Sequence, residues 1–186
     1  MPQYQGVWTL QNQAQAQSQQ QWVTDPNFKN TTLLLQADGT GSGSQNQTFL
    51  DSSTNNFFIT RGGNATQGSF SPFSCAPGYW GNYFSGGYLR TTSSTALGFS
   101  TNPFTIEAWV YMTDRAAQYY LVGGSGVSVQ VSIKTDGTLV LGIPGVGDIT
   151  ASTGTVPLNA WTHIAFVRSS TSTNGFAYYI NGAAAG

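Results

Sequence analysis

Charged side chains are scarce in this sequence. Lys and Arg number 6 and Asp and Glu number 7 among 186 residues, so the charged fraction is 7%, against about 25% in ordinary soluble domains. Nucleic-acid binding requires a dense basic face, and the basic residues are too dispersed to form one: Lys29, Arg61, Arg90, Arg115, Lys134 and Arg168. Uncharged polar residues dominate instead. Such a surface suits an extracellular or particle-bound protein and weakly charged ligands such as sugars.

Cysteine and long apolar runs are also lacking. Cys75 is the single cysteine, so no internal disulfide can form and stability must come from packing or assembly. No apolar run approaches the roughly 18 residues of a membrane span, and the first residues lack the basic-then-apolar order of a signal peptide. We therefore expect no membrane insertion. These features together are typical of a protein that is assembled inside a cell and displayed outside it, as virion proteins are.

The first 30 residues differ from the rest of the chain. Nine Gln lie between Met1 and Gln21, a low-complexity composition that buries little surface. Apolar residues flank this tract on both sides, and aromatic residues commonly anchor interfaces. A solvated tail is one interpretation, but we favour a segment that becomes ordered on a partner. The sequence therefore predicts a docking segment over residues 1–30, with the anchors Tyr4, Trp8, Leu10 and Trp22.

Strand and turn patterns dominate from Thr31 onward. In the clearest strand, Phe104 to Met112, alternate residues form one wholly apolar face and one amphipathic, aromatic face. After the alternating strand 127–134, Asp136-Gly137 predicts a hairpin turn. Many short strands with Gly-rich turns and no helix favour one all-β antiparallel jelly-roll sandwich over residues 31–186. The other predicted strands are 31–35, 57–60, 70–73, 79–89, 119–122, 138–143, 161–168 and 176–180.

The last residues contain a second hairpin signal. Asn181-Gly182 favours a type I′ turn that returns the chain alongside Phe176 to Ile180. Only four residues follow this turn, and a sheet that stopped there would leave strand-pairing groups open. We therefore expect the sandwich to be incomplete at its C-terminus, with the missing strands downstream or on another chain.

Three motifs in order resemble the laminin-G-like, concanavalin-A-like jelly-roll family. They are FTIEAWVYM (Phe104 to Met112), WTHIAFVRS (Trp161 to Ser169) and YYING (Tyr178 to Gly182). The resemblance covers about Thr31 to Gly186 and implies a jelly-roll sandwich. The family's last strands, after the N-G turn, are absent, which agrees with the expectation of an incomplete sandwich.

The front of the chain is similar to marine cyanophage virion proteins of the tail-fibre-like or structural kind. The similarity lies in YQGVWTL (Tyr4 to Leu10), TDPNFKNTTLLLQADGT (Thr24 to Thr40) and FLDSSTNNFFITRGGNATQGSFSPF (Phe49 to Phe73). This resemblance implies a phage structural protein, a tail fibre or tail-associated appendage on the virion surface. Its partners would then be other tail or baseplate proteins. A homo-oligomer is expected, with a trimer as the common form of fibres.

The sequence predicts no enzyme. Laminarinase-type relatives of this fold carry E-x-D-x-x-E, which is absent, and Glu107 is the single Glu. Retaining glycoside hydrolysis requires two carboxyl groups about 5–5.5 Å apart. We expect Glu107 to bind a neighbouring backbone group or Arg168. His163, the single histidine, is interpreted as a hydrogen-bonded structural residue, because a catalytic triad would need an evident serine elbow.

The sequence offers few residues for a metal site and several for a sugar site. Some laminin-G domains bind Ca²⁺ through loop carboxylates, but the aspartates here stand alone and turn capping is the interpretation for each: Asp38, Asp51, Asp114, Asp136 and Asp148. We expect no cofactor, with Ca²⁺ as the one alternative left open. The aromatic residues Trp109, Tyr111 and Tyr119 could form a glycan platform. The alternative function is therefore a carbohydrate-binding adhesin that recognises host surface polysaccharide.

Overall fold

The computed structural model describes residues 28–37, 47–73, 79–99, 102–123, 129–143, 147–170 and 175–186. The chain divides into two compact units. Unit 1 comprises residues 1–69 and 76–92, and unit 2 comprises residues 70–75 and 93–186. The docking residues Tyr4, Trp8, Leu10 and Trp22, together with Cys75 and Asp38, lie outside the described residues. The docking segment over residues 1–30 therefore stays a prediction.

Unit 1 is built from two short hairpin-like sheets. After the 3₁₀ turn η1 (Phe28–Asn30), strand β1 (Ile59–Gly62) pairs antiparallel with β4 (Tyr88–Thr91), and β2 (Ala65–Gly68) pairs antiparallel with β3 (Gly81–Phe84). A small apolar cluster of Phe49, Ile59 and Ala65 forms its core. The sequence predicted a single strand over residues 79–89, which in the structure is two strands with a turn between them.

A buried carboxylate organises the D-S-S-x-N segment of unit 1. Asp51 is 4% exposed and accepts hydrogen bonds from the backbone N–H groups of Leu34, Ser53 and Phe57, each at 2.9 Å. The Ser53 hydroxyl donates to the same carboxylate at 2.8 Å. This network holds residues 31–37 against the segment that follows Phe49. The strand that was predicted over residues 31–35 is reduced to one bridge between Leu35 and Asp51.

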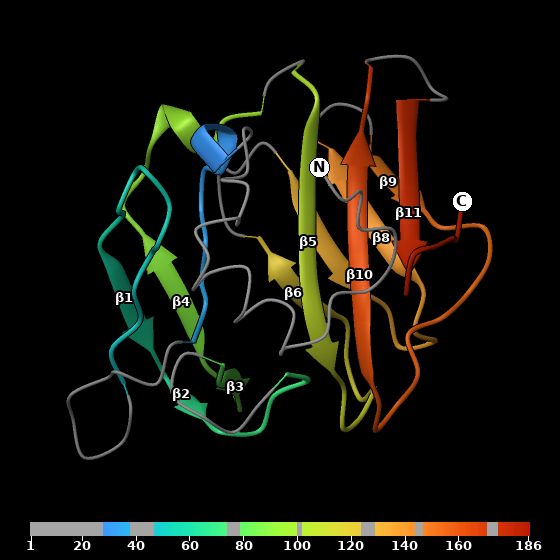
Figure 1. Cartoon of the computed structure of the whole chain (residues 1–186). Coiled ribbons are helices and arrows are strands. Elements are labelled where there is room, and N and C mark those ends of the chain that lie inside the picture. Colours follow the sequence, from blue (N-terminus) through green and yellow to red (C-terminus); the bar gives the residue numbers. More distant parts are fainter. Residues whose placement is uncertain are drawn as a thin grey trace, which may run out of the picture. The chain divides into compact units, whose positions relative to one another are not determined.

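Unit 2 is a two-layer antiparallel sandwich (Figure 1). One sheet has the order β12-β11-β10-β5 and the other the order β6-β7-β8-β9. In Figure 1 the strands β5, β10 and β11 lie side by side in front of β6, β8 and β9. The first sheet contains β5 (Phe104–Tyr111), β10 (Trp161–Arg168), β11 (Phe176–Ile180) and β12 (Ala183–Ala184); the second contains β6 (Tyr119–Val122), β7 (Gln130–Ile133), β8 (Leu139–Ile143) and β9 (Gly147–Thr150).

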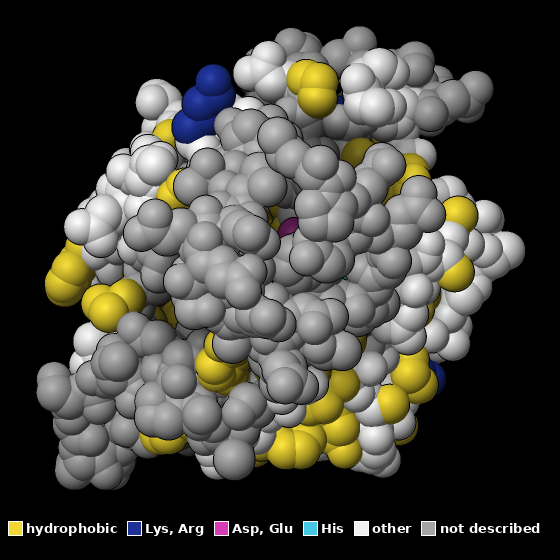
Figure 2. Space-filling view, viewed as in Figure 1, with side chains coloured by type: hydrophobic (Ala, Val, Ile, Leu, Met, Phe, Trp, Pro, Cys, Tyr) yellow, Lys and Arg dark blue, Asp and Glu magenta, His cyan; other side chains and the backbone are white. Residues whose placement is uncertain are grey.

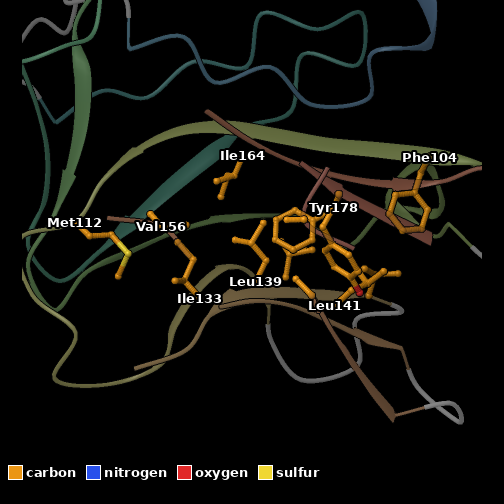
Figure 3. Close-up of a cluster of buried hydrophobic side chains, with 13 residues drawn as sticks. Phe104, Met112, Ile133, Leu139, Leu141, Val156, Ile164 and Tyr178 are labelled. Atoms are coloured by element: carbon orange, nitrogen blue, oxygen red, sulfur yellow. The ribbon is translucent and has the colours of Figure 1, made fainter. Parts of the chain in front are cut away.

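The core of unit 2 lies between these two sheets (Figure 3). Ile164 and Phe166 come from β10, and Leu139 and Leu141 from β8, and all four are at most 1% exposed. Their alternation with outward-facing residues is the period of 2 that strands impose. The predicted all-β antiparallel jelly-roll sandwich is thereby confirmed, and the structure describes two short 3₁₀ turns besides the strands, η1 and η2 (Thr95–Leu97).

Both predicted hairpin turns are present. Gly137 has φ +88° between β7 and β8. Asn181 and Gly182 both have positive φ, 50° and 79°, as a type I′ turn requires. After this turn β12 pairs with β11, and the pairing continues with hydrogen bonds between Tyr178 and residues 185 and 186.

Two differences from the predicted strands matter for function. Residues 70–73 are not a strand but a bend that belongs to unit 2. Strand β9 was not predicted at all, because its four residues, Gly147 to Thr150, show no apolar alternation long enough to recognise.

Among the residues that the structure describes, no helix is long and apolar enough to cross a membrane.

Candidate functional site

The outward face of β5 and β10 concentrates aromatic side chains. Phe104 and Met112 point into the core, so Glu107 and Trp109, an odd number of residues away, point outward. The antiparallel register places Trp109 opposite His163 and Tyr111 opposite Trp161. Directly opposite residues share a face. Four rings therefore gather in two adjacent cross-strand pairs.

These rings are in contact. The ring centroids of Trp109 and His163 are 5.4 Å apart, and those of Tyr111 and Trp161 are 5.5 Å apart. Both pairs are tilted, at 56° and 57°, in the range that aromatic pairs prefer. Trp109 nevertheless remains 43% exposed, so part of the indole surface is open to a ligand.

Residues 70–73 add two further rings to this face. The Phe70 ring lies 4.8 Å from Tyr111 in an edge-to-face geometry and 5.3 Å from Trp161. The Phe73 ring lies 5.7 Å from Trp109, also edge-to-face. Phe70 thus contacts the Tyr111 end of the surface and Phe73 contacts Trp109, and the two added rings are themselves exposed. We call this set the aromatic face: Phe70, Phe73, Trp109, Tyr111, Trp161 and His163.

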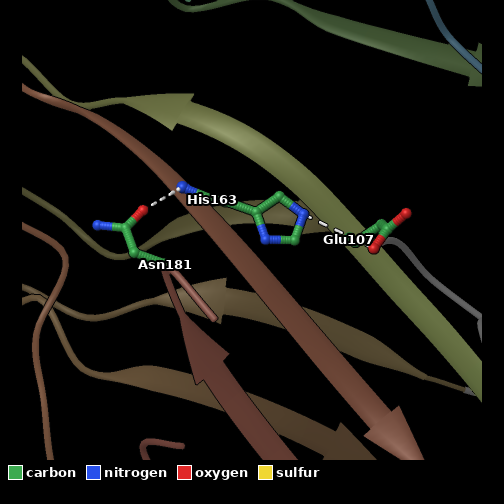
Figure 4. Close-up of polar contacts among 3 residues, drawn as sticks. All are labelled: Glu107, His163 and Asn181. Carbon is green, nitrogen blue, oxygen red and sulfur yellow. Dashed lines mark hydrogen bonds and ion pairs between the residues drawn. The ribbon is translucent and has the colours of Figure 1, made fainter. Parts of the chain in front are cut away.

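Polar groups lie near Trp109 on the same strands, and Figure 4 shows the contacts among Glu107, His163 and Asn181. Glu107 Oε2 lies 3.6 Å from His163 Nε2, and the contact is an ion pair when the imidazole is protonated. The Glu107 side chain is 64% exposed. Asn181 Oδ1 accepts a hydrogen bond from the His163 backbone N–H at 2.9 Å, and the Asn181 N–H donates to the His163 carbonyl at 2.8 Å. The Asn181-Gly182 turn thus holds the strand that carries the imidazole.

On the outward face of β5 and β10, Glu107 is the one acidic side chain, and Arg168, the one arginine of these strands, is buried. Figure 2, which is viewed as in Figure 1, shows Lys and Arg only as separate spots among the residues it colours. A face with exposed rings and few charges favours uncharged polar ligands over phosphates or nucleic acid.

The predicted platform is brought together only in part. Trp109 and Tyr111 share the aromatic face, but Tyr119 lies on β6 in the other sheet. Its hydroxyl donates to Asp114 Oδ1. This hydrogen bond raises the pKa of Tyr119, and it also lowers the pKa of Asp114. Tyr119 therefore belongs to a turn contact and is separate from the platform.

The expected contact between Glu107 and Arg168 is wrong. Arg168 is 4% exposed and points into the sandwich. Its guanidinium donates from Nε to the Asn102 carbonyl at 2.9 Å and from one terminal nitrogen to the Phe99 carbonyl at 3.0 Å. Arg168 lies directly opposite Phe104 in the antiparallel register and therefore points to the same face, into the core. Glu107 lies on the other face of the sheet.

Asp114 and Asp136 cap turns, as predicted. The prediction of a turn cap is wrong for Asp148, which lies on strand β9, and Asp51 is buried in the hydrogen-bond network of unit 1. Asp136 accepts from the Thr138 N–H at 2.9 Å and from its hydroxyl, and these bonds lower the pKa of Asp136. Asp114 accepts from the Ala116 N–H at 3.0 Å. Within the described ranges, no three His, Cys, Asp or Glu side chains come together as a metal site would need. The Ca²⁺ alternative stays a prediction.

Sequence reasoning missed four members of the aromatic face. For Trp161 and His163 a signal was available, since the W-x-H spacing places two side chains on one face of a strand. Their position beside Trp109 depends on the register of β10 against β5. For Phe70 and Phe73 no local signal existed, because their partners lie more than thirty residues away along the chain.

Comparisons with known proteins concern mainly the fold. A sequence profile of the laminin-G type, described as "Concanavalin A-like lectin/glucanases superfamily", matches residues 81–186. No curated protein sequence matches the chain. The structure resembles the crystal structure of the binding domain of Paraclostridial Mosquitocidal Protein 1, with a TM-score of 0.59 and 17% sequence identity. The match covers 86% of this chain and 40% of that chain, and at this identity it establishes similarity of fold alone.

Proposed function

Because the chain belongs to the concanavalin A-like lectin/glucanases superfamily, we propose that it is a non-enzymatic carbohydrate-binding module and that its aromatic face is a sugar site. The observation that carries this proposal is the exposed Trp109 indole, which lies beside an imidazole and an exposed carboxylate on the same face of the sheet. Sugar rings stack their C–H faces on such indoles, while their hydroxyl groups need nearby hydrogen-bond acceptors and donors.

The chemistry around Glu107 supports binding over hydrolysis. Glycoside hydrolysis needs a second carboxyl group about 5–9.5 Å away. The register neighbours of Glu107 on its own face are Thr105, Trp109 and Ala165, none of which is an acid. The function we propose therefore requires no bond cleavage, and purified protein should release no reducing ends from the polysaccharide it binds.

Binding is tested on a glycan array, followed by calorimetry with the strongest oligosaccharide. Trp109→Ala should weaken binding at least about tenfold, since the loss of a stacked ring costs about 0.5–1.5 kcal/mol beyond the area it buries. Tyr120→Ala is the matched control, because Tyr120 is an aromatic residue on β6 that is 59% exposed. The proposal fails if the array is negative, or if Tyr120→Ala weakens binding as much as Trp109→Ala.

The biological setting that we propose is a phage tail fibre or tail-associated appendage. Its support is the similarity of Tyr4 to Leu10, Thr24 to Thr40 and Phe49 to Phe73 to cyanophage virion proteins, together with the low charge. In this setting residues 1–30 dock the chain to tail or baseplate proteins, and the module contacts host surface polysaccharide. Fibres commonly use homo-oligomers, and a trimer is the form we propose.

Deletion of residues 1–30 tests the docking role. The full chain should be incorporated into particles and the truncated chain should not, as measured by immunoblots of purified virions. Light scattering on the purified full chain measures the oligomer. Incorporation of the truncated chain would show that the docking segment is not needed for attachment.

A further inference from the structure

A small polar groove lies on the outward face of the second sheet. Gln130 on β7, Gly142 on β8 and Asp148 on β9 form one cross-strand row. Gln130 lies between Val129 and Val131, which point into the core, so its side chain points outward with the rest of its row. The space above Gly142 is part of a groove of about 220 Å³ lined by Gln130, Gly142, Ile143, Gly147 and Asp148.

Gly142 makes this groove. A Cβ atom at position 142 would lie 3.0 Å from Asp148 Oδ1 and 3.5 Å from Gln130 Cβ. The same point lies 3.7 Å from Gln130 Oε1. The lack of a side chain at position 142 therefore lets the Asp148 carboxylate and the Gln130 amide oxygen lie close together above the middle strand. Glycine in the interior of a strand weakens it and often marks the close approach of a ligand.

The groove is bounded on one side by a filled row. Two residues along each strand, Ser132, Val140 and Thr150 form the next row. Ser132 and Val140 are 2% and 1% exposed although they face outward, and the Ser132 hydroxyl accepts a hydrogen bond from Gln118 Nε2 at 2.8 Å. The outward face of the sheet is thus covered at Ser132 and Val140, and it becomes accessible at Gly142.

The chemistry of the groove matches one sugar ring. Side chains on the first and third strands of a sheet start about 10 Å apart, but the Asp148 carboxylate and the Gln130 amide oxygen both lean over Gly142. They can therefore contact adjacent groups on one edge of a ring that lies on the open side of the groove. A carboxylate accepts hydrogen bonds from two adjacent hydroxyl groups, and a Gln amide both donates and accepts. The volume lies below the roughly 300–1,000 Å³ of pockets for drug-sized ligands, so the groove suits a single residue of a saccharide.

We propose that the Gln130–Gly142–Asp148 groove is a second saccharide-binding site, with Asp148 as acceptor for a pair of adjacent hydroxyl groups. The proposal deepens the proposed function, on which it rests for the class of ligand. With one site on each sheet, a single module would hold a polysaccharide at two separate points, and avidity would exceed the affinity of either site.

Amide NMR spectra of the ¹⁵N-labelled full chain test the groove directly. The probes are the methyl pyranosides of glucose, galactose, mannose and rhamnose, each titrated in the presence of EDTA. At least one should shift the amide signals of Gly142, Gly147 and Asp148. Gly142→Val, whose side chain displaces the Asp148 carboxylate, and Asp148→Asn, which removes the charged acceptor without adding volume, should each weaken this binding at least tenfold. Lys134→Gln, on the same face but outside the groove, should leave it unchanged.

The outcomes separate the groove from the aromatic face. If no probe shifts the groove signals, or if both groove variants bind as wild type does, the groove is not a saccharide site. Shifts that appear only with Ca²⁺ and without sugar would make it a cation site and overturn the proposal. Trp109→Ala should leave the groove titration intact. If the groove signals still shift and Trp109→Ala does not change binding on the array, the aromatic face is not a sugar site and the groove is.

Discussion

At the scale of single residues, the Asp51 carboxylate combines burial with four hydrogen bonds. Burial raises the pKa of Asp51, but the N–H groups of Leu34, Phe57 and Ser53 and the Ser53 hydroxyl outweigh it, so the pKa lies below its ordinary value of 3.8. A depressed pKa means that the ionised form stabilises the fold. This contribution is present above about pH 4 and is lost as the pH falls through the pKa of the folded state.

We expect Asp51→Asn to lower the free energy of unfolding of unit 1 by about 2–4 kcal/mol, because the amide NH₂ group cannot accept the bonds that one carboxylate oxygen accepts. Urea unfolding measures this difference. This difference should shrink as the pH falls below about 4, through the lowered pKa of the wild-type carboxylate. Asp136→Asn, at an exposed turn, is the matched control and should lower the stability less than Asp51→Asn does at neutral pH. A difference that does not change with pH would contradict the role of the charge.

Tyr178 gives the opposite pH dependence. Its side chain is 3% exposed, and its hydroxyl donates to the Ile149 carbonyl at 2.8 Å. Burial raises the pKa of Tyr178 from 10.0 to about 12. A raised pKa means that the stabilising contribution is present below about pH 10 and is lost as the pH rises towards 12.

Between about pH 9 and pH 12, wild type should therefore lose about 2–3 kcal/mol more stability than Tyr178→Phe. At neutral pH the variant should be less stable by about 1 kcal/mol, since the Ile149 carbonyl loses its donor. Urea unfolding at the two pH values measures both effects. If wild type and variant lose the same amount of stability between these two pH values, ionisation of Tyr178 does not cause the alkaline loss of stability.

At the scale of elements, the turn between β11 and β12 depends on its backbone geometry. Gly182 has φ +79°, and a Cβ atom there would meet no other heavy atom within 4 Å. Any cost of a side chain at this position thus comes from the left-handed conformation alone, without a steric clash. The adjacent Asn181 binds the backbone of His163, so this turn also supports the aromatic face.

Gly182→Ala should destabilise unit 2 by about 1–2 kcal/mol, the cost of a left-handed residue with a Cβ atom. Gly68→Ala is the matched control, because the space around it is equally open but its φ is not in the left-handed region. Thermal unfolding of the two variants should give a lower midpoint for Gly182→Ala and an unchanged or slightly higher one for Gly68→Ala. Equal midpoints would show that the turn tolerates other conformations.

At the scale of the whole molecule, the chain has two separate apolar cores. Phe49, Ile59 and Ala65 form the core of unit 1, and residues such as Val131 and Phe166 belong to that of unit 2. Stability need not be uniform in such a chain, because each cooperative unit can open with its own free energy.

Hydrogen exchange should resolve these two units. Asp51→Asn should reduce the protection of amides in β1 and β2 and leave that of β7 and β10 unchanged. Phe166→Ala, which empties a core position at a cost of about 3–5 kcal/mol, should do the reverse. A uniform loss of protection in both variants would show that the chain unfolds as one unit.

Local physics explains which features could be predicted from the sequence. Strand alternation, which follows from backbone geometry, placed Glu107, Trp109 and Tyr111 on the face opposite to the core. The positive φ values that Asn and Gly tolerate predicted the turn at Asn181-Gly182. The all-β class followed from many short strands and turns, and the family motifs identified the sandwich.

Only the tertiary structure decided which distant residues became neighbours. The register of β10 against β5 set His163 beside Trp109, and burial across the whole sheet determines that register. Phe70 and Phe73 joined the aromatic face from a bend that resembles a strand in sequence, while Tyr119 was paired into the other sheet. The groove at Gly142 needed three strands in one row. Alternation is a property of each strand alone, so the sequence by itself determined which residues point outward. Pairing and register arise from burial summed over the whole sandwich, so only the tertiary structure decided which outward residues meet in the aromatic face and the groove.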